Sequence, residues 1–450
     1  MAKAGTESMR IGWVDFSRKY RDKALDMLKN LEHGAVDELG IGIIRDAFAD
    51  RLFPGTSTLI TRAKYYCIIP YIIRDALDKC EGTSGDQLLK DIDARERRAG
   101  KAMWDESKKM AKSDRTAESG RVKDAEGIIG SSIFMRNENG WVKRAPSELY
   151  WNGIRAFGIC DTELSFRRYV KALYEQVRQR KERRALDAMG IGEECVDAHV
   201  YVKRCRLPDI DCIYSEKWKD GLCIDLTYKE AEFLKKKILE KQEGTLLAFL
   251  IEHDRVLLED TCANSEEPIF SSFVRRVKDA GVGEKIGVVL DNALNFMKLV
   301  YAARVRYNYI LEEKKHRCDG KAHKEAHEAW EYLSGGIREA EYVSEAAIGS
   351  ILKICDGMPG YSHKHAMKTI EFIKNLAKAF RDGNLAEADK YIVNQEKAKK
   401  GEKRAKLLNP ALVKDDKWIG GKYLDFRLPD VAHIVNDIKS GLEGAANVES

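Results

Sequence analysis

The sequence has little of what marks secreted, disulfide-linked or membrane-spanning proteins. Only 8 of its 450 residues are proline and its 10 cysteines include no Cys-x-x-Cys pair, which excludes a proline-rich linker protein and a disulfide scaffold. We expect the thiols to be reduced and mostly buried. Residues 1–17 lack the apolar core of a secretory signal, and the most apolar run, residues 65–73, is too short to cross a membrane. A cytoplasmic protein without a membrane partner is therefore expected.

Motifs of common nucleotide-binding folds are absent as well. The P-loop string Gly-x-x-x-x-Gly-Lys-Ser/Thr, whose amides and lysine hold phosphates, does not occur. The pair Gly40-x-Gly42 is followed by Arg45, where a dinucleotide-binding turn requires a small residue. No cofactor is evident, and the sequence favours a protein that is not an enzyme.

The charge is distributed unevenly along the chain. There are 78 Lys and Arg against 73 Asp and Glu, a net charge of only +5. Residues 167–184 hold eight basic and two acidic residues, a net of +6, and residues 93–123 and 396–406 carry a further +4 each. The other 390 residues must then total −9. This asymmetry indicates a polyanionic partner better than the net charge does.

Helical periodicity dominates the sequence and predicts a mainly α protein with a minor β component. The capping box formed by Thr227 and Glu230 predicts a secure helix start. The predicted helices span residues 17–31, 43–52, 58–79, 86–112, 146–157, 163–188, 227–241, 291–330, 344–355, 363–382, 385–406 and 429–442.

Short apolar runs predict the β component. Residues 127–135 and 140–144 flank a turn-like Asn-Glu-Asn-Gly string and precede the helix at 146–157, an order that suits a winged-helix-like module. A β-hairpin attached to a helical domain explains the same pattern. Further strands are expected at residues 11–16, 198–203 and 222–226.

Breaks in periodicity predict a multi-domain protein, because glycine and charge cluster near residues 120 and 215. We expect an N-terminal helical domain over residues 1–120, a middle module with the hairpin and the basic helix over 121–215, and a C-terminal helical domain over 216–450.

The segment around Pro54 has two competing explanations. A Pro-Gly turn followed by hydroxyl residues can cap a helix whose free amides bind an anion such as phosphate. Alternatively, arginines and aspartates of the segment, together with Arg62, tie two helices together by internal ion pairs. The residues concerned are Arg45, Asp46, Asp50, Pro54, Gly55, Thr56, Ser57 and Thr58.

The helix predicted at 163–188 is amphipathic, with an apolar stripe on one side and bases largely elsewhere. Such a helix can pack by one face and present the other to phosphates. An ordinary solvated face, balanced by acidic residues elsewhere, is the competing explanation. The candidate nucleic-acid contacts are Arg62, Lys64, Arg167, Arg168, Lys171, Arg178 and Lys181.

Metal binding is suggested only by a short cluster. His323 and His327 lie one helical turn apart, and Cys318 precedes them; imidazole and thiolate suit zinc. A solvated helix with incidental histidines is the competing explanation, because four ligands at structural spacing are not visible.

Several strings resemble those of a known bacterial family. Ile-Gly-Trp-Val-Asp-Phe-Ser at residues 11–17, Ile-Arg-Asp-Ala-Phe-Ala-Asp at 44–50 and Phe-Pro-Gly-Thr-Ser-Thr at 53–58 resemble the opening of domain of unknown function 6361. The resemblance continues through Pro-Ser-Glu-Leu-Tyr-Trp at 146–151 to Leu-Asp-Phe-Arg at 424–427, so it extends along essentially the whole chain. It implies no catalytic residues, but it implies a place in bacterial defence or restriction islands, beside helicases and nucleases.

These observations lead to one functional hypothesis and two rivals. We expect a non-catalytic nucleic-acid-binding subunit, with DNA as the expected ligand and a helicase or nuclease as the expected protein partner, in an anti-phage or restriction-type system. The first rival is a metal-dependent nuclease or nucleotide-processing effector with a dispersed site. The second is a scaffold whose basic helix meets an acidic protein.

Overall fold

The computed structural model describes most of the chain as α-helix. The described residues are 37–78, 84–113, 127–188, 205–254, 269–315, 320–356, 363–421 and 423–446. They contain fifteen α-helices and two short 3-10 helices, η2 and η3, and no strand. The mainly α class is thereby confirmed.

The chain divides into two compact units, each built from two separate stretches of sequence. Unit 1 comprises Met1–Leu52 and Arg255–Pro429, and unit 2 comprises Phe53–Asp254 and Asp430–Ser450. The boundaries predicted near residues 120 and 215 both fall within the sequence span of unit 2, and the three-domain division stays a prediction.

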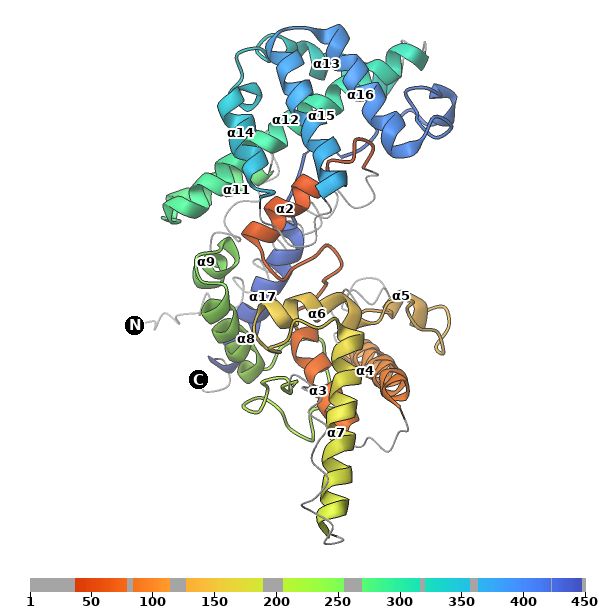
Figure 1. Cartoon of the computed structure of the whole chain (residues 1–450), viewed down its shortest axis with the longest axis vertical. Coiled ribbons are helices and arrows are strands. Elements are labelled where there is room, and N and C mark those ends of the chain that lie inside the picture. Colours follow the sequence, from red (N-terminus) through yellow and green to blue (C-terminus); the bar gives the residue numbers. More distant parts are fainter. Residues whose placement is uncertain are drawn as a thin grey trace, which may run out of the picture. The chain divides into compact units, whose positions relative to one another are not determined.

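Unit 1 is organised around α12 (Figure 1). Phe296 of this helix stacks on Phe48 of α2, and Phe426 packs against the same Phe48 ring, so that buried aromatics join three distant segments. The helices are α2 (Gly42–Leu52), α11 (Ile269–Asp279), α12 (Glu284–Lys315), α13 (Lys321–Ser334), η2 (Glu341–Val343), α14 (Glu345–Lys353), α15 (His363–Arg381), α16 (Leu385–Lys400) and η3 (Pro410–Leu412).

The length and composition of α12 would allow it to cross a membrane, and among the described helices it is the one for which this holds. Half of its most apolar stretch is buried inside the structure, and it contacts α2, α11, α13, α14 and α16. Buried Arg306 and Glu312 also lie on it. We therefore interpret α12 as the core helix of unit 1.

Unit 2 is built around α3, which is buried on nearly every side because it is apolar nearly all round (Figure 1). The rings of Tyr66 on α3 and of Tyr150 and Phe157 in and after α6 pack together in its core. The helices are α3 (Tyr65–Asp78), α4 (Gly85–Ser113), α5 (Ser131–Phe134), α6 (Pro146–Ala156), α7 (Phe166–Ala188), α8 (Tyr228–Lys241), α9 (Leu246–Glu252) and most of α17 (Leu428–Ala446).

Most predicted helices are confirmed, with shifted ends. The capping box at the start of α8 is present, with Thr227 Oγ1 accepting from the Glu230 amide. The helix predicted from residue 58 begins only at Tyr65, and the one predicted over 291–330 is the two helices α12 and α13. The helix predicted over 385–406 ends at Lys400. Helices α9 and α11 have no predicted counterpart, and the helix predicted at 17–31 lies outside the described residues.

The predicted β component and winged-helix-like module are wrong for the residues that the structure describes. Residues 127–130 form turns and residues 140–144 form no regular structure. Gly127 and Gly130 have φ values of 90° and 92°, which break an extended strand. Phe134 and Trp141, which lie in the two predicted strands, instead pack in a small cluster with Trp104 of α4.

The other predicted strands have mixed outcomes. Residues 222–226 contain no strand, and the strands predicted at 11–16 and 198–203 lie outside the described residues. The six described cysteines are all free thiols, but only Cys67 and Cys160 are buried. The expectation of mostly buried thiols is therefore wrong for the described part of the chain.

Candidate nucleic-acid interface

The first half of α7 is a packing element, as the apolar stripe predicts. Tyr169, Val170 and Leu173 are at most 2% exposed. The ring of Trp151, from α6, contacts those of Phe166 and Tyr169 with centroids 5.4 and 4.8 Å apart. These turns of α7 pack against α4 and α6, which anchors the helix in unit 2.

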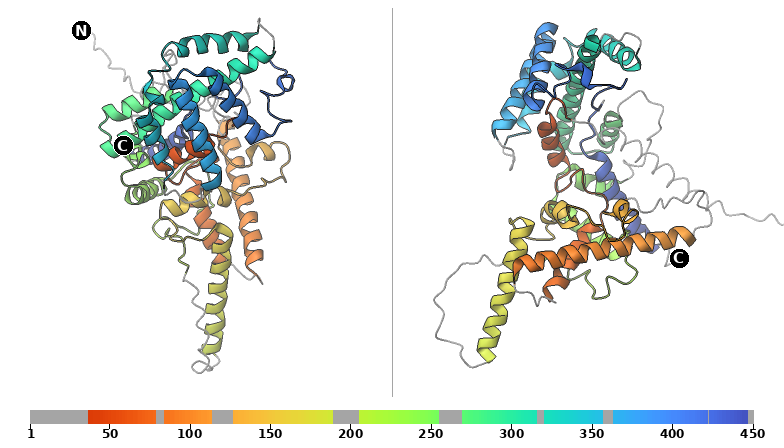
Figure 2. Two further views of the ribbon diagram at one scale, coloured as in Figure 1. Left: turned by 45° about the horizontal axis from the view of Figure 1, so that its top comes forward. Right: turned by 90° about the vertical axis from the view of Figure 1, so that its right-hand side faces the viewer.

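The second half of α7 extends beyond the helices against which the first half packs. From Arg178 to Ala185, every side chain except the half-buried Gln179 is exposed. The views agree that these last turns of α7, drawn in yellow, extend away from the other coloured helices of unit 2 (Figure 1, Figure 2). Over eight residues the helix presents five basic side chains and one acidic one.

Two basic residues of this second half lie on the same helix face as buried residues of the first half. Arg180 follows Tyr169 by eleven residues, about three helical turns, and Arg184 follows Leu173 by the same interval, so each pair shares a face. Where the tyrosine and leucine face the core, the arginines face solvent. The α7 tip, defined as residues 178–185, therefore presents cations over most of its circumference, apart from the sector that holds Gln179 and Glu182.

Few of the α7 cations are engaged in ion pairs across the structure. Arg178 pairs with Glu175 and Glu182 of its own helix at 3.1 and 3.5 Å. Lys171 pairs with Asp86 at 2.7 Å and lowers the pKa of that exposed carboxyl, to which Arg167 also contributes. Lys181 is exposed and has an interaction of its own within the chain. The exposed α7 cations that form no ion pair with any described residue are Arg167, Arg168, Arg180, Arg183 and Arg184.

The other two predicted contacts are used inside unit 2. Lys64 is 4% exposed, and its ammonium donates to Glu230 Oε2 at 2.6 Å. The Arg62 guanidinium donates from Nε to Asp437 at 2.9 Å and from Nη2 to Asp225 at 2.7 Å. Both cations already have carboxylate partners, so they are not available to a phosphate at the surface.

The anion expected before α3 is a carboxylate of the protein itself. Asp437 Oδ2 accepts from the Ala63 amide at 2.8 Å, just before the first turn of α3, and Arg62 Nε donates to the same carboxylate. Burial raises the pKa of Asp437, and the ion pair with Arg62 and the amide donor oppose that rise. The helix start thus attracts an anion, as helix N-termini do, but the anion is internal.

The Pro54-Gly55 turn itself is a packing contact. Gly55 has φ 79°, and a Cβ placed there would meet Ala156, Phe157 and Gly153 at 2.9 to 3.1 Å. Thr56 is 2% exposed, and its hydroxyl donates to Phe53 O. Ser57 is half-buried, with Oγ accepting from the Leu59 amide, and Thr58 is exposed. No helix begins at these hydroxyl residues, because residues 58–64 are non-helical.

The charged residues before this turn join two segments of unit 1. Arg427 pairs with Asp46 at 3.4 Å and with Asp50, while Arg45 pairs with Asp46 at 3.0 Å. Arg427 adopts the unusual φ of 68°. Of the two explanations for the 45–58 segment, the geometry therefore favours internal ion pairs.

The remaining basic segments are largely neutralised by neighbours. In residues 93–123, Lys108 and Lys109 pair with Asp105 and Glu106 one turn earlier on α4, and residues 114–123 lie outside the described ones. In residues 396–406, Lys406 and Lys400 both reach the buried Glu38, at 2.6 and 3.7 Å. The α7 tip is thus the basic segment whose charges are displayed most fully.

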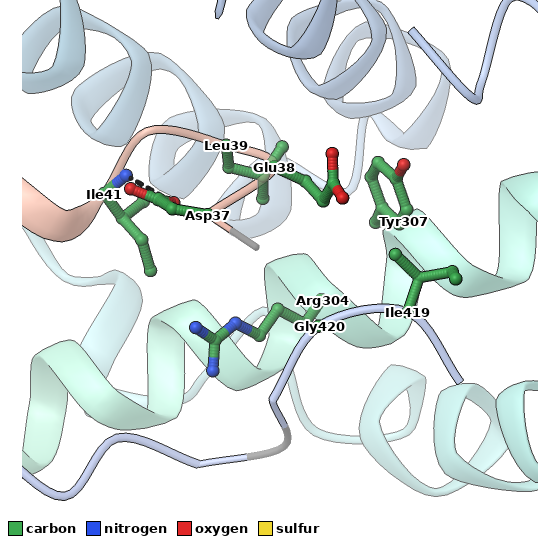
Figure 3. A pocket seen from close by; sticks show the side chains of 8 residues that line it. All are labelled: Asp37, Glu38, Leu39, Ile41, Arg304, Tyr307, Ile419 and Gly420. Atoms are coloured by element: carbon green, nitrogen blue, oxygen red, sulfur yellow. Dashed lines mark hydrogen bonds between the residues drawn. The ribbon is translucent and has the colours of Figure 1, made fainter. Parts of the chain in front are cut away.

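A hollow in unit 1 does not form a catalytic constellation. It measures about 280 Å³ including space open to solvent, below the usual size of ligand sites. Figure 3 shows Glu38 and Tyr307 on one side of it. Tyr307 donates to Glu396 at 2.6 Å, Glu38 pairs with the two lysines, and Asp37 accepts from the amides at the start of α2. Its acidic groups thus serve internal contacts.

The structure describes two of the three candidate metal ligands. His323 and His327 lie on adjacent turns of α13 with ring centroids 4.1 Å apart, and they meet Glu313 of α12, which is not among the predicted ligands Cys318, His323 and His327. Cys318 lies outside the described residues. The packing of α13 against α12 creates this proximity.

The comparisons with known proteins support one assignment. A family model described as Family of unknown function (DUF6361) matches residues 9–181, which include Arg167, Arg168, Lys171, Arg178 and Lys181. The chain matches no curated protein and no solved structure. The family resemblance expected along the whole chain is thus supported for residues 9–181.

Proposed function

We propose that this protein binds nucleic acid through α7 without catalysing its cleavage. The observation that carries the proposal is the α7 tip, whose arginines are solvent-exposed and whose Arg180, Arg183 and Arg184 have no ion-pair partner among the described residues. Cations held apart from carboxylates retain their full attraction for a phosphate backbone. Ions released from that backbone on binding then supply much of the affinity.

The shape of the tip suits duplex DNA. An α-helix with its side chains is about 10–12 Å across, close to the roughly 12 Å width of the major groove of B-DNA. A helix that presents cations over most of its circumference can contact phosphates of both strands at once. Arg167, Arg168 and Lys171, at the anchored end of the helix, extend the charged surface along the backbone.

Non-catalytic binding fits the chemistry of unit 2. The described carboxylates nearest to candidate contacts are engaged: Asp437 with Arg62, Glu230 with Lys64 and Asp86 with Lys171. Hydrolysis of a phosphodiester uses carboxylates that hold metal ions near the reacting phosphate. Unit 2 presents exposed arginines for binding, and no such constellation among its described residues.

We further propose that binding serves an anti-phage or restriction-type assembly in the bacterial cytoplasm, with a helicase or nuclease as protein partner. This part rests on the family resemblance alone. The exposed arginines of α7 support nucleic-acid binding whatever the family does.

Fluorescence anisotropy with labelled DNA tests the proposal. A variant with Arg178, Arg180, Arg183 and Arg184 replaced by glutamine should bind duplex DNA at least about tenfold more weakly than the native protein at 100 mM salt, because each phosphate left without its cation keeps its counterions. A matched variant removes four exposed lysines of the same unit, Lys217, Lys229, Lys236 and Lys241, by substitution with glutamine. It should bind like the native protein.

The same assay separates the proposal from the scaffold hypothesis. Poly-glutamate should compete with DNA only weakly, because its flexible carboxylates do not match the phosphate spacing of a duplex. Equal competition by poly-glutamate and unlabelled DNA, or equal affinity of the two variants, would overturn the proposal.

A further inference from the structure

A second site lies in unit 1, where two histidines and a carboxylate meet between α12 and α13. Each of Glu313, His323 and His327 offers one ligand atom, and the three atoms lie within 4.8 Å of one another. Ligands about 2.0–2.1 Å from one zinc ion at tetrahedral angles lie about 3.4 Å apart. The spacing is therefore close to that of a metal centre.

The hydrogen bonding of this cluster is incomplete. His327 Nε2 is 2.9 Å from Glu313 Oε1, but the orientation of the two groups does not form a hydrogen bond, and this buried nitrogen has no other partner. His323 Nδ1 is likewise buried without a hydrogen-bond partner. Buried polar atoms are usually satisfied, so two unsatisfied ring nitrogens beside one carboxylate suggest a missing common partner.

The surrounding side chains fix the rings and leave the carboxylate available. The His327 ring packs on Tyr309, with centroids 4.4 Å apart, and on the ring of His323. The two lysines that follow Glu313 are engaged elsewhere: Lys314 donates to Leu407 O and Lys315 to Glu312. Neither lysine therefore competes with a metal ion for the Glu313 carboxylate.

We propose that Glu313, His323 and His327 bind a divalent transition-metal ion, with zinc as the occupant. Two imidazoles and one carboxylate form a familiar zinc ligand set, whereas magnesium and calcium prefer oxygen ligands. The ion joins the end of α12 to α13, and three protein ligands leave one position for water or a further ligand. The site is distinct from α7 and needs no nucleic acid.

Metal analysis of tag-free protein tests the site. After dialysis against a mild chelator, the native protein should retain one zinc ion per chain. In competition titrations with a chromogenic zinc indicator, His323→Gln, His327→Gln and Glu313→Gln should each weaken zinc binding by at least roughly 10- to 100-fold, since even the removal of a group that only orients a ligand costs that much. Magnesium at millimolar concentration should not displace the zinc.

Control variants come from the same chain. Glu328→Gln changes a carboxylate on the exposed side of α13, and His253→Gln changes a histidine of unit 2; both should bind zinc like the native protein. Circular dichroism of the metal-free variants distinguishes loss of ligand from loss of fold, and zinc should raise the melting temperature of the native protein but not of the folded ligand variants. Stoichiometric zinc in a His323→Gln, His327→Gln double variant, or none in the native protein, would overturn the proposal.

Discussion

Unit 2 contains two groups of cations that look alike in sequence and differ in use. Around Thr61 to Lys64, each predicted contact is matched to a carboxylate, and Lys64 and Glu230 are almost completely buried. On α7, the tip arginines are exposed, and only Arg178 has an ion-pair partner among the described residues, in its own helix. The comparison shows that a cation's role depends on whether the fold supplies an anion, and a basic run alone does not reveal this.

The largest effect is expected from breaking the buried pair. Lys64→Met leaves the Glu230 carboxylate buried without its cation, so the free energy of unfolding should fall by about 3–5 kcal/mol. Urea denaturation followed by circular dichroism measures this. Lys171→Met, which removes a lysine with a 47% exposed side chain from an ion pair on α7, should cost less than about 1 kcal/mol. Equal losses would abolish the distinction between the two groups.

Glu96 provides a further contrast with Glu230, because it is a buried carboxyl without a described cation partner. It accepts from the amide and hydroxyl of Ser147 at 2.7 and 3.1 Å, and burial raises its pKa from 4.5 to about 8. Between these pH values the folded state keeps a proton that the unfolded chain releases, so the free energy of unfolding falls as pH rises.

Glu96→Gln removes this titration; its oxygen can still accept from the Ser147 amide, and its NH2 can donate to the Ser147 hydroxyl. The variant should therefore gain stability relative to the native protein as pH rises from 4.5 to 8, by roughly 4 kcal/mol. Urea denaturation across this pH range checks the sign. Glu106→Gln, on the same helix, should follow the native curve, and parallel curves for the native protein and Glu96→Gln would contradict the assigned pKa shift.

The smallest effect on stability is expected at the α7 tip. Replacing Arg180, Arg183 and Arg184 with glutamine removes exposed side chains that form no ion pair with described residues, so each change should alter the free energy of unfolding by less than about 0.5 kcal/mol. Thermal and urea unfolding of the triple variant measure the sum. A loss above about 2 kcal/mol would mean that these arginines hold the fold together.

What the sequence predicts well is local. The capping box at Thr227 and Glu230 is confirmed because its two members are one turn apart, and the buried stripe of α7 is confirmed because helical spacing determines which side chains share a face. The false strands at 127–135 show the limit of such reasoning: an apolar run can pack on a helix without pairing as a sheet.

The contacts that the sequence does not predict are those between residues far apart in the chain. Asp437 meets Arg62 across 375 positions and Glu230 meets Lys64 across 166, so neither pair has a local signal. The sequence predicts the apolar stripe of α7, but it does not predict how far along α7 the neighbouring helices extend. It therefore does not show that Arg180, Arg183 and Arg184 are more exposed than the other basic residues of α7. Likewise the spacing of His323 and His327 is visible in the sequence, whereas Glu313 meets them only because α13 packs against α12.

The most direct test of the central claim is the salt dependence of DNA binding. Log affinity should fall linearly with log salt, and replacing Arg178, Arg180, Arg183 and Arg184 with glutamine should make the slope shallower by about 0.9 for each phosphate that the variant no longer neutralises. The account predicts a change of roughly two to four in slope between 50 and 200 mM salt, with the native slope retained in the matched four-lysine variant. An unchanged slope in the α7 variant would show that the exposed arginines do not contact the nucleic acid.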